Sequence, residues 1–201
     1  LSLTGFKWIG KMINDYPELE YICGGEESFG FLAGNHVRDK DAITSALILS
    51  ELCNELKNKN SSFYDRLIEC YINYGFFKEK LITEIAKGKK GAKEIDDKIN
   101  SFRKNPPKLL DNSSVVKIYD YKKSLLTKTK NNNLSQIKLP KSNLLIFESS
   151  DGTRVAVRPS GTEPKIKYYF SVNTKLNSKG DFNFKNDFLN KKINSLIKQF
   201  I

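Results

Sequence analysis

The chain has 201 residues, of which 39% are hydrophobic, and this is enough for the packed cores of one large or two small domains. It contains no run of eighteen apolar residues, so the sequence predicts no transmembrane helix and no membrane partner. The formal net charge of +11 is compatible with nucleic-acid binding, but the lysines are spread along the chain, often beside Asn, and arginine is scarce. The composition therefore favours an anionic small molecule over nucleic acid as the ligand.

The cysteines and the start of the chain bear on its cellular setting. Cys23, Cys53 and Cys70 are odd in number and lack CxxC spacing, which predicts reduced, buried thiols in a cytoplasmic protein. The chain begins at Leu1 without an initiator Met or a basic-then-apolar leader. We therefore expect it to be cut from something longer.

The first part of the chain alternates helical and strand patterns and predicts an α/β domain over residues 1–75. Its predicted elements are a helix over 4–14, a strand over 19–23, and helices over 42–56 and 63–72, the last stopped at Gly75.

Residues 24–30, Gly-Gly-Glu-Glu-Ser-Phe-Gly, follow the predicted strand. Charged and polar side chains cannot sit in a core without partners, and in open α/β sheets the ends of strands are where ligands bind. Adjacent carboxylates and a hydroxyl are good acceptors for sugar hydroxyls. A solvated loop or a helix-capping carboxylate pair is the alternative.

Residues 36–41, His-Val-Arg-Asp-Lys-Asp, precede the second predicted helix. If this segment is extended, alternation places His36, Arg38 and Lys40 on one side, and Asp39 or Asp41 caps the helix. Cations just before a helix N-terminus add to its dipole as an anion site. Alternatively, they pair with nearby acids, and His36 is then a hydrogen-bonding loop residue rather than a catalyst.

The remainder, residues 76–201, predicts an α+β domain whose sheet is covered by helices on one face. Its predicted elements are a strand over 76–85, a helix containing 95–102, strands over 115–121, 143–149, 153–157 and 166–170, and a final helix through 188–200. The Asn-rich stretch 122–139 predicts a mobile polar connection.

The most chemically loaded segment is residues 158–167, Arg-Pro-Ser-Gly-Thr-Glu-Pro-Lys-Ile-Lys, between the last two predicted strands. A phosphate cradle needs a planar guanidinium fork, hydroxyl donors, a permissive backbone position and point charges. The candidates here are Arg158, Ser160, Gly161, Thr162, Lys165 and Lys167. If the flanking strands pair as a hairpin, Arg158 and Lys167 can close over the loop. An ordinary hairpin turn in a Lys-rich protein is the alternative.

Several of these motifs occur together, and in the same order, in one family. Residues 4–9 resemble its helix leading into the active-site strand of the third domain, 25–28 its sugar-binding loop, 38–41 the segment that supplies a substrate-contacting Lys, and 158–162 its fourth-domain phosphate loop. The chain thus resembles the C-terminal part of an α-D-phosphohexomutase, of the phosphoglucomutase/phosphomannomutase superfamily. It is nearest the branch that contains phosphoglucomutase and phosphopentomutase, and the resemblance spans nearly all of its residues.

The resemblance implies a fold and an activity. The fold is an incomplete third α/β domain over 1–75, then a complete C-terminal α+β domain over 76–201, a TATA-binding-protein-like antiparallel sheet with helices on one face. Family members move a phosphoryl group between the C1 and C6 oxygens of a hexose phosphate. A phosphoserine donates to one end, and the bisphosphate formed turns end for end before the serine takes back the other phosphate. The implied cofactors are Mg²⁺, which polarises the transferring group, and glucose 1,6-bisphosphate.

The resemblance also assigns roles to residues of this chain. The implied sugar-binding residues are Glu26 and Ser28, assisted by Lys40, with Thr4, His36 and Arg38 as further candidates. The implied phosphate-binding residues are Arg158, Ser160, Gly161, Thr162, Lys165 and Lys167. Two positions depart from the family pattern: this chain has Lys167 where other branches have Arg, and Ala42 where many relatives have Gly.

Two catalytic segments of the family are not in this sequence: the Ser-His-Asn phosphoserine loop and the Asp-x-Asp-x-Asp metal loop. We therefore expect no catalytic or metal-binding residue in the chain, no mutase activity from the chain alone, and the missing N-terminal domains as its partners. Glucose, mannose and pentose phosphates remain open as substrates. A non-catalytic sugar-phosphate-binding module and a basic nucleic-acid-binding protein are the alternative functions.

Overall fold

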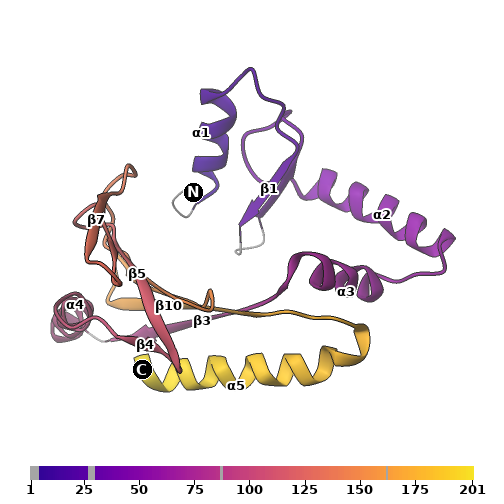
Figure 1. Ribbon diagram of the computed structural model, residues 1–201. Coiled ribbons are helices and arrows are strands. Elements are labelled where there is room, and N and C mark those ends of the chain that lie inside the picture. Colours follow the sequence, from indigo (N-terminus) through magenta and orange to yellow (C-terminus); the bar gives the residue numbers. More distant parts are fainter. Residues whose placement is uncertain (1–4, 27–29, 87, 162) are drawn as a thin grey trace. The chain divides into compact units, whose positions relative to one another are not determined.

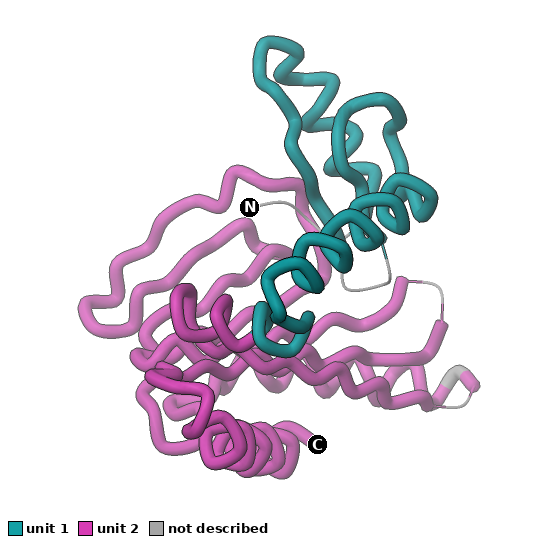
Figure 2. The backbone as a smooth tube through the Cα atoms, turned by 90° about the vertical axis from the view of Figure 1, so that its right-hand side faces the viewer, with its two compact units in different colours: residues 1–67 teal, residues 68–201 magenta. Residues whose placement is uncertain are grey.

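The computed structural model describes residues 5–26, 30–86, 88–161 and 163–201, and the chain divides into two compact units, residues 1–67 and 68–201 (Figure 2). The division lies within helix α3, Phe63–Tyr74. Gly75 ends this helix with a left-handed backbone, φ +101°, as the sequence predicts. The domain ranges 1–75 and 76–201 stay a prediction.

The first unit is built from two helices and a β-hairpin (Figure 1). Its elements are α1 (Lys7–Asp15), β1 (Cys23–Glu26), β2 (Gly30–Ala33), α2 (Ala42–Asn58) and the start of α3. The strand predicted over 19–23 is wrong, because β1 begins at Cys23 and runs through both glycines to pair antiparallel with β2. A Cβ at Gly25 would lie 2.9 Å from the carbonyl oxygen of Gly30, so this glycine permits the close backbone approach that the hairpin requires.

A small apolar cluster holds this unit together. Phe6 and Ile13 of the α1 region are buried against Leu32 of β2, with Ile9 and Tyr21 packed beside them. The next helix, α2, begins as the sequence predicts. Its N-cap is Asp41, whose carboxylate accepts hydrogen bonds from the backbone N–H groups of residues 43 and 44.

The second unit is a large antiparallel sheet with helices on one face (Figure 1). Its elements after α3 are β3 (Phe76–Ile85), α4 (Gly88–Lys104), β4 (Leu109–Leu110), β5 (Ser113–Asp120), β6 (Leu125–Lys128), β7 (Asn133–Gln136), β8 (Leu145–Ser149), β9 (Arg154–Pro159), β10 (Lys165–Thr174), the 3-10 turn η1 (Lys179–Asp181) and α5 (Phe182–Phe200). The strand order is β3-β10-β9-β8-β5-β6-β7, and the short β4 pairs with β5.

The predicted mobile connection over 122–139 is wrong, since this stretch forms β6 and β7. They extend the sheet beyond β5, with Asp120 opposite Leu125 and Lys128 opposite Asn133. The Asn-rich run supplies the turn of this hairpin, where Asn132 adopts a left-handed φ of 48°, a conformation that Asn tolerates better than most residues.

The core of the second unit lies between the sheet and helices α4 and α5. Alternate residues of β10 are buried, and α5 contributes one stripe of buried apolar residues at helical spacing. The buried residues of these two elements are Ile166, Tyr168, Phe170, Val172, Leu189, Ile193, Leu196 and Phe200. The intervening residues of β10, including Lys165 and Lys167, lie on the opposite side of the sheet, which we call the open face.

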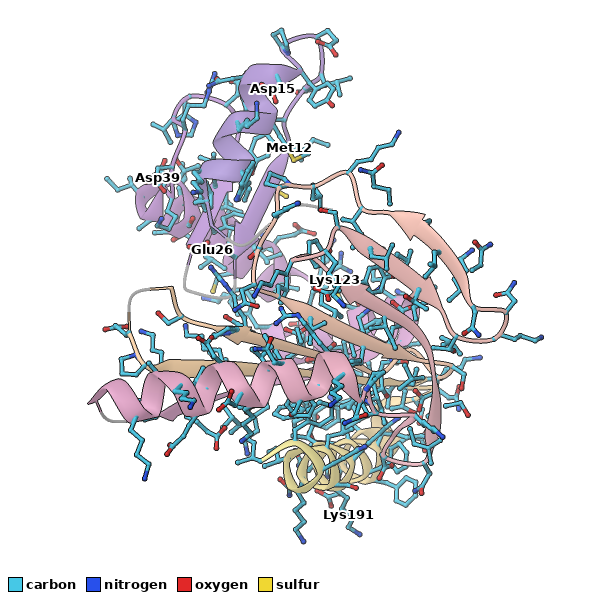
Figure 3. All side chains as sticks on the ribbon, turned by 90° about the vertical axis from the view of Figure 1, so that its left-hand side faces the viewer. Met12, Asp15, Glu26, Asp39, Lys123 and Lys191 are labelled. Carbon is cyan, nitrogen blue, oxygen red and sulfur yellow. The ribbon has the colours of Figure 1, made fainter. Side chains whose placement is uncertain are left out.

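All three cysteines are free, but Cys23 and Cys53 are exposed, so the expectation of buried thiols is wrong for them. Within the described ranges, no helix combines the length and apolar character needed to span a bilayer. The positive charge is spread over the surface, with Lys123 in the β5–β6 turn and Lys191 on the outer side of α5 (Figure 3).

Candidate functional site

Strands β9 and β10 form a hairpin, and the loop between them is the chemically loaded segment. In the hairpin register, Lys167 lies directly opposite Arg158, and Ile166 lies opposite Pro159. Directly opposite residues of an antiparallel pair share one face of the sheet, so Arg158 and Lys167 are neighbours on the open face. The expected hairpin is therefore formed, and it brings these two cations together.

Backbone hydrogen bonds hold the loop in place. The Ser160 N–H donates to the Lys165 carbonyl at 2.8 Å, and the Glu163 N–H donates to Ser160 Oγ at 3.3 Å. The Pro164 carbonyl accepts from the N–H of Ala86 at 2.8 Å, which ties the loop to the end of β3. The loop is thus anchored at both ends of its turn.

Gly161 lies at the outer part of this loop. It does not adopt the left-handed backbone that its residue type would permit. A Cβ placed at Gly161 would meet no atom within 4 Å, so the space beside its backbone is open to a ligand. Gly161 therefore does not provide a left-handed turn, but it leaves room for a bound group to approach its backbone closely. Thr162 lies outside the described residues.

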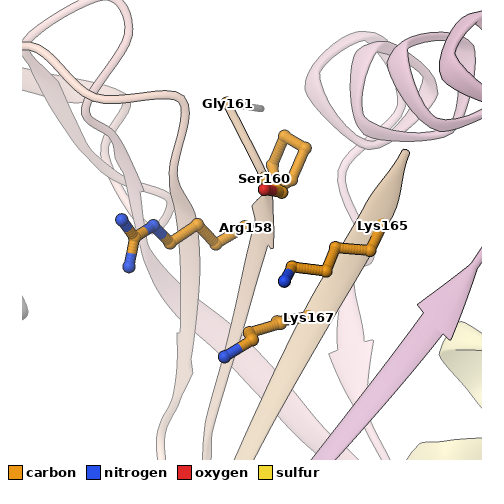
Figure 4. A pocket seen from close by; sticks show the side chains of 6 residues that line it. Arg158, Ser160, Gly161, Lys165 and Lys167 are labelled. Atoms are coloured by element: carbon orange, nitrogen blue, oxygen red, sulfur yellow. The ribbon is translucent and has the colours of Figure 1, made fainter. Parts of the chain in front are cut away.

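The loop and the two strands line a pocket of about 280 Å³ (Figure 4). Its lining consists of Arg158, Pro159, Ser160, Gly161, Lys165 and Lys167. Lys165 and Lys167 extend from β10 toward β9, where Arg158 and Ser160 lie (Figure 4). The structure therefore brings together five of the six predicted phosphate-binding residues, all except the undescribed Thr162.

The charges of this pocket are only partly neutralised. Lys165 forms an ion pair with Glu163, and this hydrogen bond lowers the pKa of the Glu163 carboxyl. Among the described residues, no carboxylate lies within ion-pairing distance of Arg158 or Lys167. A guanidinium fork and an ammonium group that form no close ion pair suit a phosphate dianion. The described lining thus offers positive charge and hydrogen-bond donors, which suit the binding of an anion.

A second group of predicted residues meets in the first unit. Glu26 is the last residue of β1, and Lys40 Nζ lies 3.9 Å from Glu26 Oε1 and 2.8 Å from Asp39 Oδ1. The hydrogen bond from Lys40 to Asp39 raises the pKa of the lysine and lowers that of the aspartic acid. The structure thus places a carboxylate, which accepts hydrogen bonds, and an ammonium group, which donates them, together at the end of a strand, where both could contact hydroxyl groups.

Sequence reasoning missed two residues around this pair. The Phe6 ring lies 5.2 Å from Lys40 Nζ, which adds a cation–π contact. A Cβ at Gly30 would lie 2.7 Å from Glu26 and 2.8 Å from Lys40, so only glycine leaves room for both side chains. Gly30 is the last residue of the glycine-rich segment 24–30, so a glycine at this position is the sequence feature that could have predicted the close approach.

The other predicted sugar-binding residues make local contacts. Residues 34–36 and 38–39 form bends, so the alternation expected to align His36 and Arg38 with Lys40 is absent. His36 Nε2 lies 2.8 Å from Asp41 Oδ2, beside the helix cap, and Arg38 Nε donates to Asn14 Oδ1 at 2.9 Å. Glu26 and Asp39 are labelled in Figure 3. Thr4 and Ser28 lie outside the described residues.

Within the part of the chain that the structure describes, no three His, Cys, Asp or Glu side chains converge as a metal site would require. The candidate pocket itself is lined by cationic groups, which repel a metal ion.

Comparison with protein families gives two successive matches, separated by residues 72–98. Residues 1–71 match the family description "Phosphoglucomutase/phosphomannomutase, alpha/beta/alpha domain III", and residues 99–175 match "Phosphoglucomutase/phosphomannomutase, C-terminal domain". An α/β segment followed by an antiparallel α+β domain is the order that the sequence predicts. The fold-class prediction is confirmed.

Curated relatives extend this finding. The chain is 39% identical over 171 residues to a phosphoglucomutase of Staphylococcus epidermidis, and 37% identical over 171 residues to one of Staphylococcus aureus. Each alignment covers 85% of this chain but 31% of the relative, so the chain spans about a third of the length of the proteins it matches.

A solved structure shares the fold. Parafusin, a phosphoglucomutase of Paramecium crystallised in an open form, aligns with a TM-score of 0.58 at 23% identity. The alignment covers 98% of this chain and 33% of that one.

Proposed function

Because the chain belongs to the phosphoglucomutase/phosphomannomutase family, we propose that it is the substrate-recognition part of a cytoplasmic hexose phosphate mutase. The complete protein would interconvert hexose 1-phosphate and hexose 6-phosphate through a bisphosphate such as glucose 1,6-bisphosphate. In this proposal the second unit binds the phosphate that is not being transferred, and the first unit contacts the sugar hydroxyls.

The observation that carries the proposal is the cationic pocket on the β9–β10 hairpin. Arg158 and Lys167 are neighbours in the register, and no described carboxylate lies within ion-pairing distance of either, while Ser160 lies beside them. Each charge-assisted hydrogen bond to a phosphate oxygen is worth about 1.5–3 kcal/mol. Binding energy at the fixed phosphate then positions the other end of the substrate for in-line transfer.

Mg²⁺ would supply charge neutralisation at the transferring phosphoryl group in the complete enzyme. The residues described here do not fit that ion, because the pocket is cationic and no set of three ligands converges. The roles proposed for this chain are therefore limited to binding and orientation, and we expect no turnover from the chain alone.

Calorimetric titration of glucose 6-phosphate and glucose 1,6-bisphosphate into the chain, at two salt concentrations, tests the phosphate site. We expect saturable binding that Arg158→Ala weakens about tenfold or more. The matched control is Arg154→Ala, which removes the same side chain from the same strand and face. Arg154 is already paired with Glu148, so this variant keeps wild-type affinity.

The outcomes distinguish the alternative functions. Equal loss of affinity in the two variants, or binding that fades with salt alike for sugar phosphates and generic polyanions, would favour a non-specific role for the positive charge. The sugar contact has a separate test. Glu26→Gln is expected to weaken glucose 6-phosphate binding several-fold while leaving the affinity for inorganic phosphate unchanged.

A further inference from the structure

Strand β3 forms one edge of the sheet and pairs only with β10 among the described residues. The hydrogen bond from the Ala86 N–H to the Pro164 carbonyl continues the β3–β10 register, in which Ile85 lies opposite Lys165. Because hydrogen-bonded positions alternate along an antiparallel strand, even-numbered residues of β3 bond to β10. The N–H and C=O groups of residues 77, 79, 81, 83 and 85 therefore point outward from the sheet.

This edge is long and carries apolar side chains. β3 has 10 residues, whereas β7 at the other edge has 4. Phe77, Leu81 and Ile85 lie on the open face along the edge and are 54%, 44% and 76% exposed. A long unpaired edge with exposed apolar residues is a ready surface for pairing with another strand.

We propose that β3 pairs antiparallel with β3 of a second copy of this chain, about a two-fold axis through Leu81. Residues whose numbers add to 162 would then lie opposite each other, so every outward-pointing residue meets another outward-pointing residue. A hydrogen-bonded antiparallel ladder requires outward-pointing residues to face each other in this way. The pairing allows about ten intermolecular backbone hydrogen bonds.

The side chains of β3 are complementary in this register. Leu81 lies against Leu81 of the second copy, and Phe77 lies against its Ile85, so the exposed apolar residues cover one another. Lys78 lies against Glu84 and Glu79 against Thr83, so no like charges are opposed. Shifting the axis to Lys80 would keep the hydrogen-bonding parity but set two lysines against each other. The sequence of β3 therefore favours the register centred on Leu81 over the one centred on Lys80.

The neighbouring helix α5 also suits a second copy. Its side that reaches β3, marked by the hydrogen bond from Lys78 to Asn186, carries asparagines at helical spacing: Asn183, Asn186, Asn190 and Asn194. The chain has a net charge of +11, which opposes association of like copies in general. An uncharged ridge beside the β3 edge reduces that repulsion where two copies would meet.

Sedimentation equilibrium of the chain, with Leu81→Lys beside it, tests the proposal. We expect a monomer–dimer equilibrium whose dissociation constant Leu81→Lys raises about tenfold or more, because two ammonium groups replace an apolar contact at the axis. The matched control is Leu134→Lys, which makes the same change at a 58% exposed position on the opposite edge strand and is expected to leave the dimer intact. Far-UV circular dichroism verifies that both variants fold.

A second pair of variants tests the register. Thr83→Glu sets its new carboxylate against Glu79 of the second copy, twice by symmetry, and is expected to weaken the dimer several-fold. Adding Glu79→Lys makes each pair attractive and is expected to restore it. A folded chain that stays monomeric at every concentration, a dimer equally sensitive to both lysine variants, or a failure of Glu79→Lys to rescue would overturn the proposal.

Discussion

The two ends of strand β9 carry the same residue type in opposite circumstances. At its start, Arg154 Nε donates to Glu148 at 2.9 Å, and Lys117 Nζ reaches the same carboxylate at 2.6 Å. At its end, Arg158 has no acidic partner among the described residues and lines the candidate phosphate pocket. Both arginines lie on the open face, four positions apart.

The difference comes from where the neighbouring strand begins. Glu148 of β8 lies opposite Arg154, and Lys117 of β5 lies opposite Glu148, so the three charges form one cross-strand row. β8 starts at Leu145, which lies opposite Val157. No residue of β8 therefore lies beside Arg158, whose neighbour on the other side is Lys167. The sheet neutralises an arginine in its interior and leaves one uncompensated at its margin.

The largest expected effect comes from giving Arg158 the acidic partner it lacks. Lys167→Glu places a carboxylate directly opposite Arg158, so it removes one cation and competes with phosphate for the other. We expect the affinity for glucose 6-phosphate, measured by calorimetry, to fall about a hundredfold. Lys167→Met removes the charge alone and should cost about tenfold. Equal losses in the two variants would mean that Arg158 does not bind the phosphate.

The reverse change acts on the partnered end. Glu148→Gln leaves Lys117 and Arg154 facing a neutral, largely buried amide, so the two cations repel each other without compensation. Both cations are partly exposed, which limits the expected loss in the free energy of unfolding to about 1–2 kcal/mol. Urea denaturation measures this loss. Calorimetry should show unchanged phosphate affinity, and a large drop in affinity would show that the two ends of β9 are not independent.

The turn that leads into β9 gives the partnered end a pH dependence. Burial opposes ionisation of Asp151, but hydrogen bonds from Lys192, Ser149 and the Thr153 N–H outweigh it and hold the pKa of Asp151 well below its usual value of 3.8. A depressed folded-state pKa gives stability that is present above the unfolded-state pKa and is lost as the pH falls through the folded-state pKa.

Asp151→Asn tests this pH dependence. The Asp151 side chain is partly exposed, so we expect the variant to be about 1 kcal/mol less stable than wild type at pH 7. The difference should shrink as the pH falls below about 4. Denaturation curves at a series of pH values measure it, and a difference that is constant down to acid pH would assign the effect to packing rather than to charge.

Much of this architecture could be predicted from local sequence pattern. Helix periodicity identified α2 and α5, and Asp41 was among the two residues predicted to cap α2. The Asp151-Gly152 turn and the pairing of Arg158 with Lys167 follow from two-residue strand alternation and turn chemistry. These features depend on residues close together in sequence.

The failures share a different cause. β6 and β7 are short and lack a clear strand pattern, and they are strands because β5 offers an edge to pair with, which no local pattern records. β1 runs through two glycines because β2 lies beside it. The acid that neutralises Arg154 but not Arg158 lies on another strand, so the sequence could supply both arginines without showing which one is available to a ligand.

The smallest expected effect concerns Lys167 itself, where a point charge stands opposite a guanidinium. Lys167→Arg keeps the charge and adds a planar fork able to bind two phosphate oxygens, so we expect about threefold tighter binding of glucose 6-phosphate. Lys165→Arg is the matched control, since Lys165 lines the same pocket but is paired with Glu163 and should show no gain. Tighter binding by Lys165→Arg and none by Lys167→Arg would show that Lys165 contacts the phosphate rather than Lys167. The ion pair with Glu163 would then not identify the lysine that binds the phosphate.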